Sequence, residues 1–178
     1  MERRNDQANP QPSTSTTPSR TNPNDVVREI KDQESRKPNL IIHNIPESDA
    51  EGLERVNHDK EKALEVANVC NVTWKNEDVV NAVRLGRKKM DGKPRPLLIK
   101  LVNEEKKKAL FKNVKLLQTA PEGFKEIGIQ NDLTKQQREE EKRLWEEAKR
   151  KETDSSGKEK YRVRGPPWAR RVEKVMNQ

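Results

Sequence analysis

The sequence predicts an α+β protein in which a small sheet and its helices follow a polar tail. Three observations lead to this fold class. Short apolar runs with the character of strands occur at residues 39–45 and 97–102. Segments with the apolar spacing of helices lie between and after them. Residues 1–24 combine four prolines with Ser, Thr, Asn and Gln, which predicts a disordered tail.

Composition limits how much of the chain a core can hold. Of the 178 residues, 29% are hydrophobic and 38% are charged, against roughly 45–50% and 25% in ordinary domains. The formal net charge of +8 and the pI of about 9.6 favour a polyanion as partner over an acidic small molecule, and we expect no small-molecule substrate. The charge is uneven. Residues 39–83 carry nine acidic and four basic side chains, whereas residues 84–115 carry twelve basic and three acidic ones.

Several classes of protein are excluded by what the sequence lacks. The single cysteine, Cys70, cannot form an intramolecular disulfide, and its distance in sequence from His43 and His58 gives no metal-ligand spacing. We therefore expect no metal and no cofactor. No apolar run approaches about 18 residues, and the start of the chain lacks the apolar stretch of a signal peptide. We expect no membrane partner and a cytoplasmic or nuclear location.

The first structured elements are expected after the tail. Residues 25–37 predict a short helix, with an apolar stripe that is long enough only for the stub of a coiled coil. Residues 39–45, closed by Pro46, predict a buried central strand. Residues 56–71 carry apolar side chains at helical spacing and predict a helix packed on the sheet, and residues 78–87 predict a second strand.

The next elements complete a domain at residues 38–131. Asp91-Gly92, a favoured hairpin pair, predicts that a strand at 97–102 lies antiparallel to the second strand. Asn103 is suited to cap a helix at 104–117, and residues 127–129 predict a fourth strand. The order strand, helix, strand, strand, helix, strand predicts the split βαβ, or ferredoxin-like, arrangement.

A basic region at residues 132–178 is expected to follow this domain. Thr134 and Gln137 form a capping-box pattern for a highly charged helix that runs to about residue 151. Residues 154–158 predict a flexible link. Residues 161–172 then predict a strand, a Gly-Pro-Pro turn and a second short strand.

Strand parity predicts which side chains face the open side of the sheet. A lysine in the core is costly, so Lys100 is expected on the open side with Leu98. The same reasoning places Ile41, His43 and Arg84 there, beside the basic turn at residues 88–96. A phosphate backbone could follow such a cationic surface. The predicted contacts in this domain are His43, Arg84, Arg87, Lys88, Lys89, Lys93, Arg95 and Lys100.

The C-terminal hairpin supplies a second set of candidate contacts. Its two aromatic side chains flank several arginines, so they can stack on a base or serve only as surface residues. Both interpretations stay open. Trp145, on the charged helix, is expected to pack against the preceding domain. The predicted contacts in the hairpin are Tyr161, Arg162, Arg164, Trp168, Arg170 and Arg171.

Short motifs then occur in a characteristic order. They are Arg36–Ile42 (RKPNLII), which leads into His43-Asn44-Ile45 and Pro46-Glu47, then Arg84–Gly86 (RLG), Arg95–Ile99 (RPLLI), Asn131–Thr134 (NDLT) and Val163–Pro167 (VRGPP). The first strand (LIIHNI) resembles the first-strand signature of RNA-recognition-motif domains. The ordered set, over about 140 residues, resembles the first-open-reading-frame proteins of non-LTR (LINE-type) retrotransposons.

The resemblance implies an RNA-binding protein that coats element RNA as a coiled-coil oligomer and acts as a nucleic-acid chaperone. The chain departs from that family in two respects. The coiled coil is almost absent, and the open sheet face offers Ile41 and Leu98 where RNA-recognition motifs present stacking aromatics. Because stacking supplies about 1–3 kcal/mol per base, we expect binding that depends on charge and tolerates any sequence.

The functional prediction is a binder of single-stranded RNA, with single-stranded DNA as an open alternative, and no enzymatic activity. Glu139, Glu140 and Glu141 are consecutive on a helix and point in different directions, which argues against a two-metal nuclease site. A homo-oligomer through the helix at 25–37 is also expected. Two alternatives stay open: a sheet that docks a peptide or another copy, and the amino-terminal piece of an endonuclease and reverse-transcriptase polyprotein.

Overall fold

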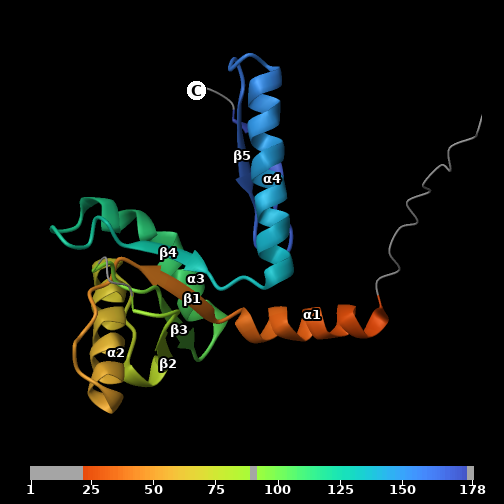
Figure 1. Ribbon diagram of the computed structural model, residues 1–178. Helices are drawn as coiled ribbons and strands as arrows, with labels where there is room; N and C mark the ends of the chain where they lie inside the picture. Colours follow the sequence, from red (N-terminus) through yellow and green to blue (C-terminus); the bar gives the residue numbers. More distant parts are fainter. Residues whose placement is uncertain (1–21, 89–91, 176–178) are drawn as a thin grey trace, which may run out of the picture.

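The computed structural model describes residues 22–88 and 92–175, and it has an α+β fold (Figure 1). A four-stranded antiparallel sheet has the strand order β2-β3-β1-β4. The strands are β1 (Asn39–His43), β2 (Val79–Arg84), β3 (Leu97–Leu101) and β4 (Gly128–Asn131). A separate hairpin pairs β5 (Lys160–Arg164) with β6 (Arg171–Val175).

The helices are α1 (Pro23–Arg36), α2 (Gly52–Val69), α3 (Glu104–Asn113) and α4 (Lys135–Asp154). Short 3-10 helices, η1 (Asn76–Asp78) and η2 (Val114–Thr119), precede β2 and follow α3. Each predicted strand and helix is therefore confirmed, with shifted ends. The predicted tail lies outside the described residues except for residues 22–24. There Asn22 caps α1 by accepting a hydrogen bond from the Asn24 N–H, so the helix begins earlier than expected.

One face of the four-stranded sheet carries the core. Leu40 and Ile42 of β1 are fully buried there, as are the three alternating residues Leu97, Ile99 and Leu101 of β3. They pack with Ala63, Val66 and Ala67 of α2 and with Leu110 of α3. Both helices therefore cover the same face of the sheet, and their apolar stripes bury the surface that stabilises the domain.

Local capping explains where α3 and α4 begin. The Asn103 side chain accepts a hydrogen bond from the Lys106 N–H at 3.1 Å, as predicted. The Thr134 hydroxyl accepts from the Gln137 N–H at 3.2 Å, and the Gln137 side chain accepts from the Thr134 N–H at 3.1 Å. This reciprocal capping box satisfies two N–H groups that lack partners within the helix.

The C-terminal part of the described chain is α4 with the β5–β6 hairpin beside it, extending away from the sheet (Figure 1). Leu144 and Ala148 of α4 are buried in this small unit. Helix α1 is tied to the segment between β4 and α4. Its Arg36 Nη1 donates to Asp132 at 2.9 Å, and its Glu29 carboxylate accepts from the Thr134 hydroxyl at 2.5 Å.

Two kinds of feature are absent from the described residues. None of the helices between residues 22 and 175 combines the length and the apolar character that a membrane crossing needs. Within the same residues, His, Cys, Asp and Glu side chains form no group suited to hold a metal ion.

Candidate nucleic-acid interface

The prediction that Arg84 faces the open side of the sheet is wrong. A β-bulge shifts the register between Val79 and Asn81, so Ala82 and Arg84 point to the core face instead of Val83. A bulge adds one residue to a strand and reverses the alternation of every side chain after it. Arg84 lies opposite the buried Leu97, and its side chain is only 3% exposed.

The buried Arg84 is fully hydrogen-bonded. Its Nε and Nη2 donate to Asp59 Oδ1 of α2 at 3.0 and 2.7 Å. The remaining donors reach the backbone carbonyls of Ile45, Arg95 and Pro46 at 2.8, 2.9 and 2.7 Å. A guanidinium has five N–H donors, and all five are used here. Arg84 therefore joins α2, β2 and the two loops beside them, and it is not available to a ligand.

Ion pairs link the basic stretch at residues 84–115 to the acidic stretch that precedes it. Each of four cations of the first stretch pairs with a carboxylate of residues 39–83. The pairs are Arg84–Asp59, Lys88–Asp49, Arg95–Glu47 and Lys106–Asp78, at 2.7–3.0 Å. The folded chain thus neutralises part of the charge that the sequence places in one segment, and the predicted cationic surface is weaker there.

Arg95 is held by Glu47 rather than exposed. Its Nε and Nη2 lie 3.0 and 2.8 Å from Glu47 Oε2, and its backbone N–H donates to Glu47 Oε1. Hydrogen bonds from Arg95 hold the pKa of the Glu47 carboxyl below its usual range. The pair fixes the loop before β3 against the segment after β1.

The other predicted contacts of this stretch have different positions. Arg87, Lys88, Lys93 and Lys100 are exposed, and Lys89 lies outside the described residues. Lys88 pairs with Asp49 at the surface, whereas Arg87 and Lys100 make no ion pair within residues 22–88 and 92–175. Lys100 therefore remains the one predicted cation that a strand of the sheet presents to the open face.

The open face itself is mostly apolar. Val83, Leu98 and Ile41 are paired across β2, β3 and β1, so they form a row, with Gln130 of β4 at its end. Ile41 is only 8% exposed, which differs from the predicted exposed position. His43 is half-buried, and its Nε2 is buried without a hydrogen-bond partner among the described residues. Neither offers the broad aromatic surface that base stacking needs.

Ile41 is shielded because α4 approaches this face. A hollow of about 430 Å³ is lined by Ile41 and Gln130 of the sheet and by Leu133, Arg138, Lys142 and Trp145. Trp145 is 53% exposed, so the predicted packing against the domain is incomplete. Arg138 and Lys142 are cations that parity arguments on the strands could not find. Their spacing with Trp145, three to four residues apart on one helix, is the signal that places all three on one face.

The β5–β6 hairpin has one strongly cationic face. Cross-strand pairing places Arg162 opposite Glu173 and Arg164 opposite Arg171, and Lys160 follows on the same side. The Arg164 and Arg171 side chains are 58% and 69% exposed and lie 4.0 and 2.6 Å from Glu173. Four cations thus share one carboxylate on this face, which we call the arginine face: Lys160, Arg162, Arg164 and Arg171.

Tyr161 and Arg170, also predicted contacts, lie elsewhere. Tyr161 alternates with Arg162 and points to the opposite side, where Lys151 Nζ of α4 lies 5.9 Å from its ring centroid. Its hydroxyl donates to Glu159 at 2.6 Å, which raises the pKa of the tyrosine. Arg170 pairs with Glu141 of α4. Both side chains stabilise the packing of the hairpin on α4, so the predicted stacking role of Tyr161 is not supported by its position.

Trp168, the last predicted aromatic contact, lies in the turn between β5 and β6. It is 60% exposed, and Lys37 Nζ lies 6.0 Å from its ring centroid.

Comparison of the chain with family models and with curated protein sequences gave no match.

Proposed function

We propose that this chain is a sequence-tolerant, single-stranded RNA-binding protein of retrotransposon type that coats RNA and acts as a nucleic-acid chaperone. The observation that carries the proposal is the arginine face, where four cations and one carboxylate, Glu173, lie on the same side of the hairpin. A phosphate backbone on this face would replace the counterions that such a cluster attracts, and their release favours binding.

The sheet supports the proposal through its topology. The order β2-β3-β1-β4, with α2 and α3 on one face, fits the ferredoxin-like arrangement of an RNA-recognition-motif domain. Such an arrangement leaves the other face for a ligand. Lys100 lies on that face, and Arg138 and Lys142 of α4 lie beside it.

The expected sequence tolerance and chaperone activity follow from the side chains of the open face. Phe, Tyr and Trp are absent from β1, β2, β3 and β4, all of which the structure describes in full. With little stacking from the sheet, charge supplies most of the attraction, and charge does not distinguish bases. Strands that are held in this way can exchange, which is what a chaperone requires.

A titration of labelled single-stranded RNA at several salt concentrations tests the proposal. We expect the logarithm of the affinity to fall linearly with the logarithm of the salt concentration. Parallel titrations of single-stranded DNA and of duplex DNA measure the preference for RNA and for single strands. Affinity that does not change with salt, or no binding near about 50 mM salt, would contradict the proposal.

Self-association through α1 is part of the proposed function. Val26, Val27 and Ile30 are all about half-exposed and form an apolar stripe on this helix. A helix of 14 residues supports only weak association, because stable coiled coils need several heptads. Sedimentation over a range of protein concentrations measures this self-association. Ile30→Glu is the variant that disrupts the apolar stripe.

A second candidate function is supported by the apolar residues of the open face. Val80 of β2, Val83 and Val102 are each 42–51% exposed. An exposed apolar surface of this kind also suits a docked peptide or a second copy of the sheet. The two candidate functions predict opposite effects of substitutions at Lys100 and Val83 on RNA binding and on self-association.

A further inference from the structure

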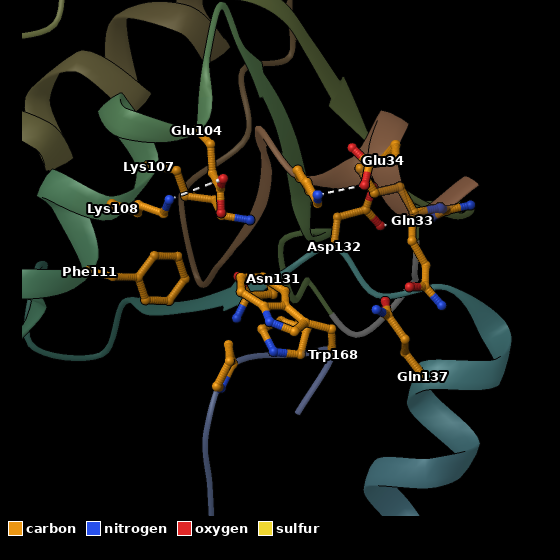
Figure 2. A pocket seen from close by; sticks show the side chains of 14 residues that line it. Gln33, Glu34, Glu104, Lys107, Lys108, Phe111, Asn131, Asp132, Gln137 and Trp168 are labelled. Carbon is orange, nitrogen blue, oxygen red and sulfur yellow. Dashed lines mark hydrogen bonds and ion pairs between the residues drawn. The ribbon is translucent and has the colours of Figure 1, made fainter. Parts of the chain in front are cut away.

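A hollow of about 390 Å³ lies where five parts of the chain meet, separate from the open sheet face (Figure 2). It is bordered by the end of α1, by α3, by the end of β4, by the start of α4 and by the turn between β5 and β6. Its volume falls within the range of roughly 300–1,000 Å³ that is typical of ligand pockets.

Aromatic and proline side chains form much of its lining. Trp168 and Phe111 approach from the hairpin turn and from α3, with Pro166 and Pro167 next to the tryptophan. Figure 2 shows the indole of Trp168 between Phe111 and Gln137. A tryptophan that is 60% exposed at the border of a hollow leaves a ring face for a flat ligand.

Amide side chains provide hydrogen-bonding groups in the same hollow. The Asn131 side chain makes no hydrogen bond within the part of the chain that the structure describes. Gln137 uses its oxygen in the cap of α4 and keeps its NH₂ group. In contrast, Asp132 is occupied by Arg36 and Asn39, each at 2.9 Å. The Asn131 amide and the Gln137 NH₂ group are therefore available, and such groups suit the edge of a nucleobase. Lys107 is a buried cation of the same lining, and its Nζ donates to the Asn39 carbonyl at 3.1 Å.

Cations lie around the rim. Lys37 lies close to the Trp168 ring and pairs with Glu34 at 2.5 Å, and Lys108 pairs with Glu104 at 3.1 Å. The turn that carries Trp168 begins and ends beside Arg164 and Arg171 of the arginine face. The arginine face therefore ends at the turn that borders the hollow, so a strand bound along that face needs to continue only past this turn to reach it.

We propose that one base of a bound strand inserts into this hollow, stacks on Trp168, and is hydrogen-bonded at its edge by Asn131 and Gln137. This inference rests on the proposed function and adds to it. The sheet strands lack aromatic residues, and Trp168 supplies the stacking contact that they do not. A single base is fixed in this way while the rest of the strand is held by charge.

The test compares two strands of equal charge. One is single-stranded RNA of about 12 nucleotides, and the other is an abasic strand of the same length. The wild-type protein is expected to bind the base-bearing strand about 5- to 150-fold more tightly, which is the range for one stacking contact. Trp168→Ala should remove this preference and leave the affinity for the abasic strand unchanged.

Three further variants make the test specific. Trp168→Phe keeps an aromatic ring and should retain most of the preference, whereas Asn131→Ala should weaken binding of the base-bearing strand alone. Trp145→Ala removes the other half-exposed tryptophan, which lies in the hollow beside the open sheet face. Circular dichroism of each variant confirms that it is folded.

The outcomes separate this inference from the proposed function. A preference that survives in Trp168→Ala, or that disappears in Trp145→Ala alone, would overturn the inference. Salt-dependent binding of both strands without any preference in the wild type would also overturn it, and the proposed function would stand. If neither strand binds, both proposals fail.

Discussion

Arg84 and Asp59 form an ion pair inside the domain, with Nη2 of the guanidinium 2.7 Å from Oδ1 of the carboxylate and both side chains 3% exposed. The pair joins β2 to α2 beneath the sheet. The guanidinium of Arg84 also donates to three backbone carbonyls in two loops. It therefore satisfies carbonyls that would otherwise be buried without a hydrogen-bond partner.

Removal of one partner is expected to destabilise the domain strongly. Arg84→Met leaves the Asp59 carboxylate buried and unpaired, and the expected loss in free energy of unfolding is about 3–5 kcal/mol. The double variant Arg84→Met with Asp59→Leu leaves no unpaired charge at this position, so it should be more stable than Arg84→Met alone. Urea unfolding followed by circular dichroism measures the free energy of unfolding of both variants. Equal stability of the single variant and the wild type would show that the pair contributes little.

The strands and helices of this chain could be predicted because their signals are local. The run at 39–45, the cap at Asn103 and the capping box at Thr134 depend on neighbouring residues only. The bulge after Val79 has no such local signal, because it depends on how β2 pairs with β3. One inserted residue was enough to move Arg84 from the predicted ligand surface into the core.

The arginine face is expected to account for much of the salt dependence of RNA binding. Each contact with a phosphate of a single strand contributes about 0.7 to the slope of log affinity against log salt. The triple variant Arg162→Ala, Arg164→Ala and Arg171→Ala should therefore lower that slope by about 2 and weaken binding most at low salt. Fluorescence anisotropy at several salt concentrations measures the slope.

A matched control removes three cations from the helices that pack on the four-stranded sheet, outside the arginine face. Lys60 of α2, Lys112 of α3 and Lys115 of η2 serve this purpose. The change in net charge is the same, so this triple alanine variant should keep the wild-type slope if location matters. Similar losses in the two triple variants would mean that net charge alone attracts the RNA.

The pair of Glu47 and Arg95 predicts a dependence of stability on pH. The pKa of Glu47 is lowered in the folded state, so its contribution is fully present above the ordinary glutamate pKa. That contribution is lost as the pH falls through the folded value. The difference in free energy of unfolding between wild type and Glu47→Gln should be largest near neutral pH and shrink below about pH 4.3. A difference that does not change with pH would exclude this role.

The charge of the candidate site was harder to predict than its fold. Residues 84–115 have the most concentrated positive charge in the sequence, yet four of those cations meet carboxylates from residues 39–83. Such pairs join residues 25 to 48 positions apart, and no local pattern reveals them. Of the four hairpin arginines predicted as contacts, Arg162, Arg164 and Arg171 are exposed, whereas Arg170 pairs with Glu141 of α4. A two-stranded ribbon beside one helix has one covered face, and the sequence alone does not show which side chains lie on it.

Lys100 and Val83 distinguish RNA binding on the open face from docking of a protein. They lie on neighbouring strands and both point away from the core. If RNA follows this face, Lys100→Glu should weaken RNA binding and lower the salt slope by about 0.7 or more, because a contact becomes a repulsion. Val83→Asn, which removes an apolar side chain without adding charge, should then leave RNA affinity within about twofold, since phosphate contacts carry the binding. RNA titration and sedimentation of each variant provide the two readouts. Self-association that Val83→Asn abolishes, together with RNA affinity that Lys100→Glu does not change, would assign the open face to docking and leave RNA to the arginine face.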